Sequence, residues 1–462
     1  MIHSAVSTDK NVDEKEYQQI SHYVDSNRQN LSFLTGIGKS AQNEALKAYI
    51  LSYSKENLRM TPDIIIPRNK PSQPAAVRFF IDHSGSMDGY VHGLTDFKDA
   101  FGKLFSKSRF HYGDSNVSLY FLDSVALPVL FTRIEALDTL LSDDKKSKFR
   151  TGRRSETRLN ALLKQVLDNT SANAISVFAS DCIYSLEKGK SAIDGLQHDG
   201  MLITNAFLDK LSQSDFSTVI LRLQSQFTGN YWHADNTPTP LANKVRPYFL
   251  WIIGEDELVR EFLKQIGVFS LKGLSNSYFL QTAAAQQVPY FTILEEMGKI
   301  GSFRKSDRET ETIQSIKDVS YQGDTLQFAI AIDMKDIPVD AAYLLDRDNY
   351  KVTGGYTVRS VKRIDRKEIS DREFKVLEQT SATHILLVTT TSQYPFHNLT
   401  VELVRNLPAW IGTGSCTDDH NIDSTMNKTF GFSYLAQGVA EAYNTKDTGR
   451  TAYLTINILI RN

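Results

Sequence analysis

The chain has 462 residues, of which 41% are hydrophobic and 10% aromatic, and its 52 basic residues nearly balance its 54 acidic ones. A chain of this length and composition is expected to fold into two or three globular domains. The nearly neutral charge gives no electrostatic reason to expect a nucleic acid or an anionic membrane surface as a partner.

The chain has only two cysteines, Cys182 and Cys416, which lie far apart in the sequence. This spacing excludes a disulfide framework and a cysteine-based zinc site, and Cys182, which follows an apolar run, is expected to be a packed thiol. The first residues lack the apolar stretch of a signal peptide, and no apolar run approaches roughly 18 residues. We therefore expect a reduced, soluble, cytoplasmic protein with no membrane span.

Residues 1–75 are expected to form a helical N-terminal region, because apolar residues recur in them at helical spacing. The segment PRNKPSQP, residues 67–74, contains three prolines and is predicted to lead into the next domain.

Residues 76–268 alternate between strand-like and helix-like segments. Several strand-like segments are continuous runs of β-branched and aromatic residues, which are typical of strands covered on both faces. The alternation predicts an α/β fold with a doubly wound, mostly parallel sheet and helices on both faces. A short turn within residues 117–134 predicts an antiparallel hairpin at one edge. The predicted strands are 77–81, 117–122, 126–134, 174–180, 217–227 and 247–254, and the predicted helices are 94–107, 157–169, 201–213 and 256–267.

Residues 269–314 are expected to be a linker, since the block 304–314 is strongly charged. Strands predominate from 315 to 462, where apolar and polar residues alternate in LTVELV and LTINILI. One helix is expected at 432–444. The pattern predicts a β-rich, sandwich-like C-terminal domain.

The most informative stretch is AVRFFIDHSGSMDGY, residues 76–90, in which an apolar strand ends in an aspartate that two serines follow. In an open α/β sheet, ligands bind beyond the carboxyl ends of the strands. Asp82 lies at such an end, and Ser84 and Ser86 place hydroxyl groups on the same loop. One carboxylate with several hydroxyls suits Mg²⁺ or Mn²⁺. Because few protein charges neutralise such an ion, we expect it to accept an acidic oxygen from outside.

The sequence DHSGSM resembles the Asp-x-Ser-x-Ser motif of von Willebrand factor A (vWA) domains, the metal-ion-dependent adhesion site (MIDAS) that they share with integrin I domains. The family adds a threonine from a later loop and an aspartate at the end of the fourth strand. The segments 155–165 and 175–185 resemble these two elements, in the family's order. The resemblance covers residues 76–268. It implies that Ser84, Ser86 and Thr157 bind the metal ion directly. Asp82 and Asp181 would bind it directly or through water.

Two features of the chain depart from the family's pattern. Arg153, Arg154 and Ser155 stand where the family often has glycines, so Ser155 or Thr151 remains an alternative to Thr157 as a ligand. In addition, Cys182 stands where the family has a glycine after the aspartate.

The resemblance implies a non-enzymatic protein–protein interaction module, with no catalytic residues and no organic cofactor. The Asp or Glu of a partner protein would complete the coordination of its Mg²⁺ or Mn²⁺. By analogy with intracellular bacterial members of the family, we expect a component of a multi-protein system of the stress or defence type. Two alternatives stay open, a structural scaffold or oligomerisation protein with a vestigial site and a metal-dependent hydrolase. Against the metal-dependent hydrolase, the motif has no obvious general base nearby. A serine hydrolase with Ser84 as its nucleophile is disfavoured because the Gly-x-Ser-x-Gly pattern is missing.

Two further polar segments carry candidate residues. The segment CTDDHNID, residues 416–423, is predicted to be a polar loop, with a second cation site as the alternative, although EF-hand spacing is missing. In YWHADNTPTP, residues 231–240, Tyr231 and Trp232 either mark a binding surface or cover the edge of a core. His83 is expected to be packed or to face solvent, because strand alternation directs it away from its neighbours.

Overall fold

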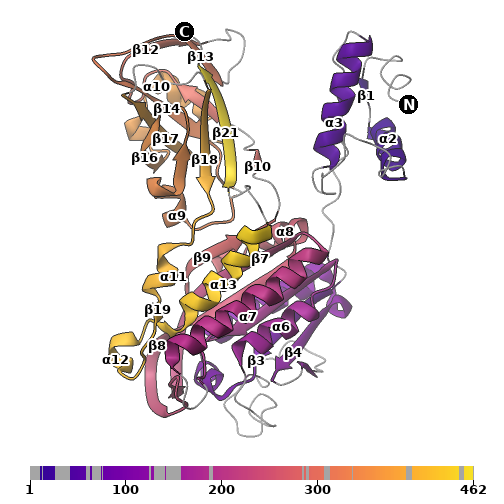
Figure 1. Ribbon diagram of the computed structural model, residues 1–462, viewed down its shortest axis with the longest axis vertical. Helices are drawn as coiled ribbons and strands as arrows, with labels where there is room; N and C mark the ends of the chain where they lie inside the picture. Colours follow the sequence, from indigo (N-terminus) through magenta and orange to yellow (C-terminus); the bar gives the residue numbers. More distant parts are fainter. Residues whose placement is uncertain are drawn as a thin grey trace. The chain divides into compact units, whose positions relative to one another are not determined.

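A computed structural model gives the architecture of the protein (Figure 1). Contacts between Cα atoms divide the chain into two compact units, Met1–Ser72 and Gln73–Asn462. The structure describes residues 11–12, 14–26, 42–58, 63–64, 74, 76–123, 126–129, 141, 158–186, 191–282, 286–287, 291–305, 313–335, 337–391, 398–446 and 452–460.

The first unit is mainly helical in its described part, as the sequence pattern predicts. Tyr17, Ile20 and Val24 are buried at helical spacing on one side of α2, as are Leu46 and Ile50 of α3. The elements of the unit are β1 (Asn11–Val12), α2 (Glu14–Ser26), α3 (Gln42–Tyr53), the π-helical turn η4 (Ser54–Leu58) and β2 (Asp63–Ile64), of which β1 and β2 pair in parallel.

The second unit contains a mixed sheet of seven strands in the order β5-β4-β3-β6-β8-β7-β9. The strands are β3 (Ala76–Asp82), β4 (Val117–Leu122), β5 (Ala126–Val129), β6 (Ala174–Ser180), β7 (Phe216–Trp232), β8 (Pro238–Glu255) and β9 (Leu274–Leu280). Strand β3 pairs in parallel with β4 and β6, and β5 pairs antiparallel with β4. The antiparallel edge hairpin predicted within residues 117–134 is therefore confirmed.

The expectation of a mostly parallel sheet is wrong for the other half of the sheet. The pairs β6–β8, β8–β7 and β7–β9 are all antiparallel. Strands β7 and β8 form one long hairpin, although the sequence pattern predicts only their buried parts as strands, at 217–227 and 247–254. Helices on both faces produce the same continuous apolar runs whether neighbouring strands run parallel or antiparallel, so the pattern could not tell them apart.

Helices cover both faces of this sheet. Phe79 of β3 packs edge-on against Phe101 and Phe105 on one face, with ring centroids 5.6 and 4.9 Å apart. Its neighbour Phe80 belongs to the hydrophobic cluster of the opposite face. The first face is covered by α4 (Asp96–Tyr112) and α8 (Asp256–Ile266), and the opposite face by α6 (Leu159–Asp168), α7 (Ala192–Gln213) and α13 (Phe432–Lys446).

Helix α13 comes from the C-terminal region of the sequence but packs along α7 (Figure 1). The two backbones approach so closely that a Cβ atom on Gly438 would lie 2.5 Å from the carbonyl oxygen of Gly200. The hydroxyl of Thr204 donates to the carbonyl oxygen of Gly438 over 3.0 Å. The C-terminal part of the chain thus completes the helical layer on the sheet.

Two further sheets lie in the C-terminal half of the second unit. One has the order β12-β13-β21-β18-β15, with β10 beside β21, and the other the order β11-β14-β17-β16. Buried side chains from both sheets belong to one hydrophobic cluster. The strands are β10 (Gln286–Gln287), β11 (Phe291–Leu294), β12 (Ser302–Lys305), β13 (Ser315–Ser320), β14 (Leu326–Ile332), β15 (Tyr350–Val352), β16 (Thr357–Arg363), β17 (His384–Thr390), β18 (Asn398–Val404) and β21 (Ala452–Ile460).

The segment 269–314, which the sequence pattern predicts to be a linker, contains strands of the sheets. It contains β9, which pairs with β7, and three strands of the C-terminal sheets. Strands β10 and β12 belong to the sheet that includes β21, and β11 belongs to the sheet that includes β14. The remaining elements are η5 (Gly85–Tyr90), η6 (Asp114–Asn116), η7 (Val268–Ser270), α9 (Ala341–Leu345), η8 (Arg347–Asn349), η9 (Arg366–Glu368), α10 (Asp371–Leu377), α11 (Ala409–Thr413), β19 (Ser415–Cys416), α12 (Ile422–Thr425) and β20 (Thr429–Phe430).

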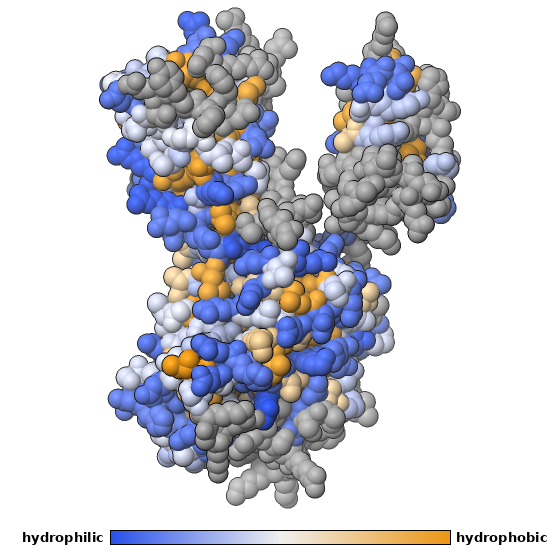
Figure 2. All heavy atoms as spheres, in the orientation of Figure 1, coloured by the Kyte–Doolittle hydropathy of each residue, from blue (hydrophilic) through white to orange (hydrophobic). Residues whose placement is uncertain are grey.

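The surface in view is mixed in character (Figure 2). Hydrophobic residues drawn in colour there are scattered among hydrophilic ones. Such scatter is usual for a protein surface. Among the helices that the structure describes, none combines the length and the apolar character that crossing a membrane requires.

Candidate metal centre

The candidate site lies where two neighbouring parallel strands end. Asp82 is the last residue of β3, and Asp181 directly follows β6. Because β3 and β6 are paired in parallel, their carboxyl ends meet at the same edge of the sheet. Both carboxylates are buried, with 4% of Asp82 and 2% of Asp181 exposed.

Both carboxylate oxygens of Asp82 accept hydrogen bonds from the protein. The backbone N–H of Ser84 donates to Oδ1 over 2.8 Å, and the hydroxyl of Ser180 donates to Oδ2 over 2.8 Å. Ser180 was not among the predicted site residues, although its place directly before Asp181 is a signal for it. Its contact fixes the orientation of the Asp82 carboxylate.

The two serines of the motif link the carboxylates. The hydroxyls of Ser84 and Ser86 are 2.9 Å apart, and Ser86 hydrogen-bonds to Asp181. Four of the five predicted ligands are therefore gathered at one place. The fifth, Thr157, lies outside the residues that the structure describes, as do its alternatives at 151 and 155.

The electrostatics of the site are dominated by the two buried acids. Burial raises the pKa of Asp181 to about 7, and the neighbouring charge of Asp82 acts in the same direction. Hydrogen bonds from Ser86 and from the backbone of Ile183, and the positive charge of Arg246, lower this pKa. At neutral pH the pair therefore favours a proton or a cation close to it.

The residue after Asp181 is the cysteine that stands where the resemblance leads one to expect a glycine. Cys182 has a φ of 55°, in the left-handed region that favours glycine. Its thiol is buried, as expected, and burial raises its pKa. Its N–H donates to the hydroxyl of Ser180 over 2.9 Å, which holds the turn that carries Asp181.

The loop after β3 packs against the β7–β8 hairpin. A Cβ atom on Gly229 would lie 2.9 Å from the Cα atom of Gly89, so this contact requires glycine. A Cβ atom on Gly85 would lie 3.3 Å from Nε1 of Trp232, so the indole lies against the site loop. His83 is buried, and its ring stacks on Phe121 with centroids 5.1 Å apart, which confirms a packed histidine.

A buried arginine near the site was also missed by the sequence analysis. Arg246 on β8 is 1% exposed, and its guanidinium lies 4.2 Å from the ring centroid of Tyr231. It donates to the carbonyl oxygens of Met426 and Lys428 over 3.2 and 3.4 Å. Because the same guanidinium lowers the pKa of Asp181, it connects the candidate site to the C-terminal segment. Its place directly before the apolar run 247–254 is the sequence signal for it.

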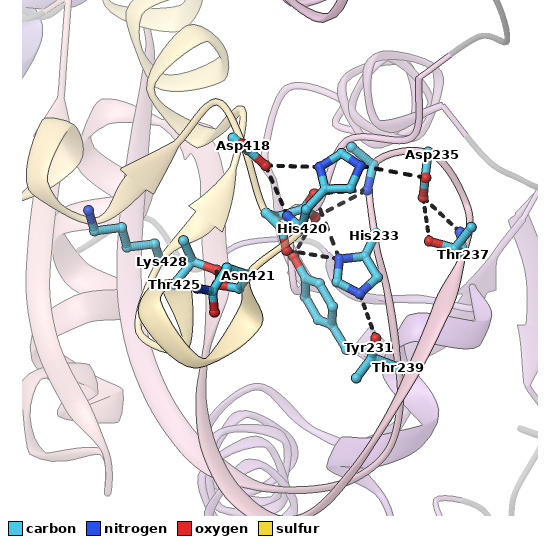
Figure 3. Close-up of polar contacts among 12 residues, drawn as sticks. Tyr231, His233, Asp235, Thr237, Thr239, Asp418, His420, Asn421, Thr425 and Lys428 are labelled. Carbon is cyan, nitrogen blue, oxygen red and sulfur yellow. Dashed lines mark hydrogen bonds and ion pairs between the residues drawn. The ribbon is translucent and has the colours of Figure 1, made fainter.

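The two polar segments singled out in the sequence contact each other (Figure 3). Asp419 is 1% exposed and accepts a hydrogen bond from the hydroxyl of Tyr231 over 2.7 Å. It also accepts from the backbone N–H of Ala234 over 3.1 Å, while its own carbonyl oxygen lies 2.9 Å from Nδ1 of His233. We call this contact between the hairpin tip and residues 416–423 the latch. Tyr231 thus covers a core edge, whereas Trp232 borders the candidate site.

The outer part of the latch is exposed. His420 lies 2.9 Å from Asp418 and 3.8 Å from Asp235 (Figure 3). The hydrogen bond with Asp418 raises the pKa of His420. Within the described ranges, no group of three or more His, Cys, Asp or Glu side chains is arranged to hold a metal ion. These contacts favour the polar-loop interpretation of residues 416–423 over a second cation site.

The chain was also compared with known proteins. No protein-family model matches it, and no curated protein matches it either.

Proposed function

We propose that the protein is a divalent-cation-dependent protein–protein interaction module with a vWA-type α/β domain and a sandwich-like C-terminal domain. A Mg²⁺ or Mn²⁺ ion bound at Asp82, Ser84, Ser86 and Asp181 would accept an Asp or Glu of a partner protein. The observation that carries the proposal is the burial of two carboxylates side by side with two serine hydroxyls at the ends of paired parallel strands. Membership of a bacterial stress or defence system remains an analogy with the family.

The donor set fits the proposed ion. All four groups offer oxygen, which hard cations such as Mg²⁺ prefer. The raised pKa of Asp181 means that the carboxylate pair is unfavourable without a counter-charge.

Each residue has a separate role in this proposal. The bound ion would supply the positive charge that a partner's carboxylate recognises. The hydroxyl of Ser180 and the N–H of Ser84 donate to the carboxylate of Asp82 and hold its side chain in one orientation. The hydroxyl oxygens of Ser84 and Ser86 would be uncharged ligands of the ion, so they would leave most of its positive charge available to a partner's carboxylate. Thr157 is proposed as a further ligand on the strength of the sequence resemblance alone.

The test measures thermal unfolding of the full chain in EDTA and in excess Mg²⁺. We expect Mg²⁺ to raise the melting temperature of the wild type and to have no effect on Asp82→Ala. Asp209→Ala, which removes an exposed aspartate from α7, is the matched control and should respond like the wild type. Equal melting temperatures of the wild type in EDTA and in Mg²⁺ would contradict the proposal.

One observation favours the scaffold alternative. Both oxygens of Asp82 already accept hydrogen bonds inside the protein, so this part of the loop has partners without an ion. A scaffold with a vestigial site would form the same oligomer in EDTA and in Mg²⁺, whereas the interaction module would capture its partner only with Mg²⁺. Measurement of molecular mass by light scattering, together with pull-downs by wild type and Asp82→Ala, separates the two.

A further inference from the structure

The tip of the β7–β8 hairpin, residues 231–240, contacts both of the loops that carry the predicted acidic and serine ligands. On the first loop, the indole of Trp232 lies against Gly85, where a Cβ atom would be 3.3 Å from its Nε1. On the second loop, the N–H of Leu186, in the segment that follows Asp181, donates to the carbonyl oxygen of Ala234 over 2.8 Å. The two loops follow different strands, so the hairpin tip is a common support for their ligands.

The first loop also packs on the hairpin at its far end. A side chain on Gly89 would overlap the ring of Phe227, and a Cβ atom on Gly229 would lie 2.9 Å from the Cα atom of Gly89. Tyr90, the last residue of η5, meets Phe227 edge-on with ring centroids 5.0 Å apart. Close packing of this kind transmits a displacement instead of absorbing it. A shift of the hairpin therefore moves the loop of the two predicted serine ligands.

The hairpin tip depends on the latch for its own position. Residues 224–232 of β7 and 238–248 of β8 pair only with each other among the strands that the structure describes. A two-stranded ribbon is marginally stable by itself and needs packing partners. Asp419 of the latch, which is buried, accepts from the hydroxyl of Tyr231 over 2.7 Å and from the N–H of Ala234 over 3.1 Å. Ala234 is therefore bonded to the latch through its N–H and to the second loop through its carbonyl oxygen.

We propose that Asp419 and Trp232 are positioning residues for the bound cation, an inference that rests on the proposed function. The latch holds the hairpin tip, and the tip holds the two ligand loops at the separation that the ion needs. Mg²⁺ requires a nearly ideal octahedron of ligands, so a loosened loop lowers its affinity. Neither residue is a predicted ligand, and both act through the hairpin. The polar segment 416–423 thereby contributes to a site from which it is far removed in the sequence.

This coupling must act in both directions. A coupling free energy is shared by two sites, so if an open latch binds Mg²⁺ more weakly, Mg²⁺ holds the latch closed by the same factor. The N–H of Ala234 reports closure of the latch, because its acceptor is Asp419. Hydrogen exchange at this N–H measures how often the latch opens. A residue that only stabilises the fold would not link this exchange to the ion.

The first part of the test titrates the full chain with Mg²⁺ by calorimetry. We expect Trp232→Ala and Asp419→Ala each to weaken Mg²⁺ binding at least fivefold. Asp419→Asn should bind Mg²⁺ within twofold of the wild type, because its amide oxygen can still accept from Tyr231 and Ala234. Trp232 is only half-buried, so Trp232→Ala keeps the proposal testable if Asp419→Ala does not fold.

Tyr343→Phe is the control for a loss of stability alone. It removes a buried hydroxyl that donates to the carbonyl oxygen of Val404 over 2.6 Å, in the C-terminal half of the second unit. We expect a lower melting temperature and an unchanged affinity for Mg²⁺.

The second part measures hydrogen exchange at Ala234 by mass spectrometry, in EDTA and in saturating Mg²⁺. Mg²⁺ should slow this exchange at least fivefold in the wild type and in Asp419→Asn. In Asp419→Ala, which lacks the acceptor, Mg²⁺ should slow it less than twofold.

The outcomes separate this inference from the proposed function. A wild type that does not bind Mg²⁺ contradicts both. A wild type that binds Mg²⁺ as tightly as Trp232→Ala and Asp419→Ala do overturns the positioning roles alone. The same conclusion follows if Tyr343→Phe weakens Mg²⁺ binding as much as these variants, or if the ion leaves exchange at Ala234 unchanged in the wild type.

Discussion

The candidate metal centre and the latch both contain buried aspartates, but the groups that surround these aspartates differ in the two regions. In the latch, Asp419 receives a hydroxyl and a backbone N–H from the hairpin tip. In the candidate metal centre, burial and the neighbouring charge of Asp82 raise the pKa of Asp181 to about 7. Asp419 therefore stabilises a contact between distant segments, whereas the Asp82–Asp181 pair is unfavourable until a proton or cation arrives. The first arrangement is structural, and the second is suited to binding.

The largest expected effect is on the latch. Asp419→Ala leaves the hydroxyl of Tyr231 and the N–H of Ala234 buried without their acceptor. We expect the free energy of unfolding to fall by about 3 kcal/mol, measured by urea denaturation. Asp418→Ala removes an exposed neighbour and should cause no measurable change. Equal losses in the two variants would contradict a structural role for Asp419.

The next effect tests the connection between the two regions. Arg246→Met removes the donors for the carbonyl oxygens of Met426 and Lys428, and we expect a loss of about 2 kcal/mol in urea denaturation. It also removes a charge that lowers the pKa of Asp181 in the folded state, so stability in EDTA should continue to fall up to a higher pH than in the wild type.

Arg222→Met is the matched control for this variant. Arg222 donates to the carbonyl oxygen of Asn427, between the two that Arg246 holds, but it is not among the groups that shift the pKa of Asp181. It should destabilise the protein without moving its pH dependence. If both arginine variants shift that dependence equally, Arg246 does not connect the latch to the site.

The sequence predicted the local parts of this arrangement well. An apolar run that ends in Asp82, and another that ends before Asp181, locate the two acids at strand ends, and the small hydroxyl residues identify the loop. These signals are local because strand ends and turns depend on neighbouring residues.

The long-range parts could not be predicted in the same way. The pairing of β6 with β8 rather than with a parallel strand, and the packing of α13 on α7, depend on contacts between residues far apart in the chain. Arg246 and Asp419 acquire these roles through such contacts, since the hydrogen bonds Arg246–Met426 and Asp419–Tyr231 join residues 180 and 188 positions apart. Hydrophobic periodicity records burial but not the identity of the neighbour.

A smaller effect is expected at the candidate metal centre itself. Unfolded, Asp181 has an ordinary pKa of 3.8, whereas folding raises it to about 7. Between these values the folded state binds more protons than the unfolded state, so the stability of the metal-free protein falls as the pH rises from about 4 to about 7. Asp181→Asn removes the charge and should stabilise the protein in EDTA at pH 8 by on the order of 1 kcal/mol more than at pH 5.5.

The same variant separates electrostatic repulsion from metal binding. Asp181→Asn should also lose the response to Mg²⁺, because the amide cannot balance the charge of the ion. Urea denaturation at both pH values, with EDTA and with Mg²⁺, measures the two effects. An unchanged pH dependence in EDTA would show that the proximity of Asp82 and Asp181 does not affect stability.

The smallest effect concerns the residue that orients Asp82. Ser180→Ala removes the hydrogen bond to Oδ2 of Asp82 and the acceptor for the N–H of Cys182. We expect a loss of about 1 kcal/mol and a weakening of Mg²⁺ binding of less than tenfold. Ser176→Ala is the control, because Ser176 is equally buried on β6 and hydrogen-bonds to Thr170 over 2.7 Å. Calorimetric titration with Mg²⁺ should find its affinity unchanged despite a similar loss of stability. Equal affinities of the two variants would mean that Ser180 only stabilises the strand end. A difference would mean that the orientation of Asp82, and not merely its presence, determines how the site binds a cation.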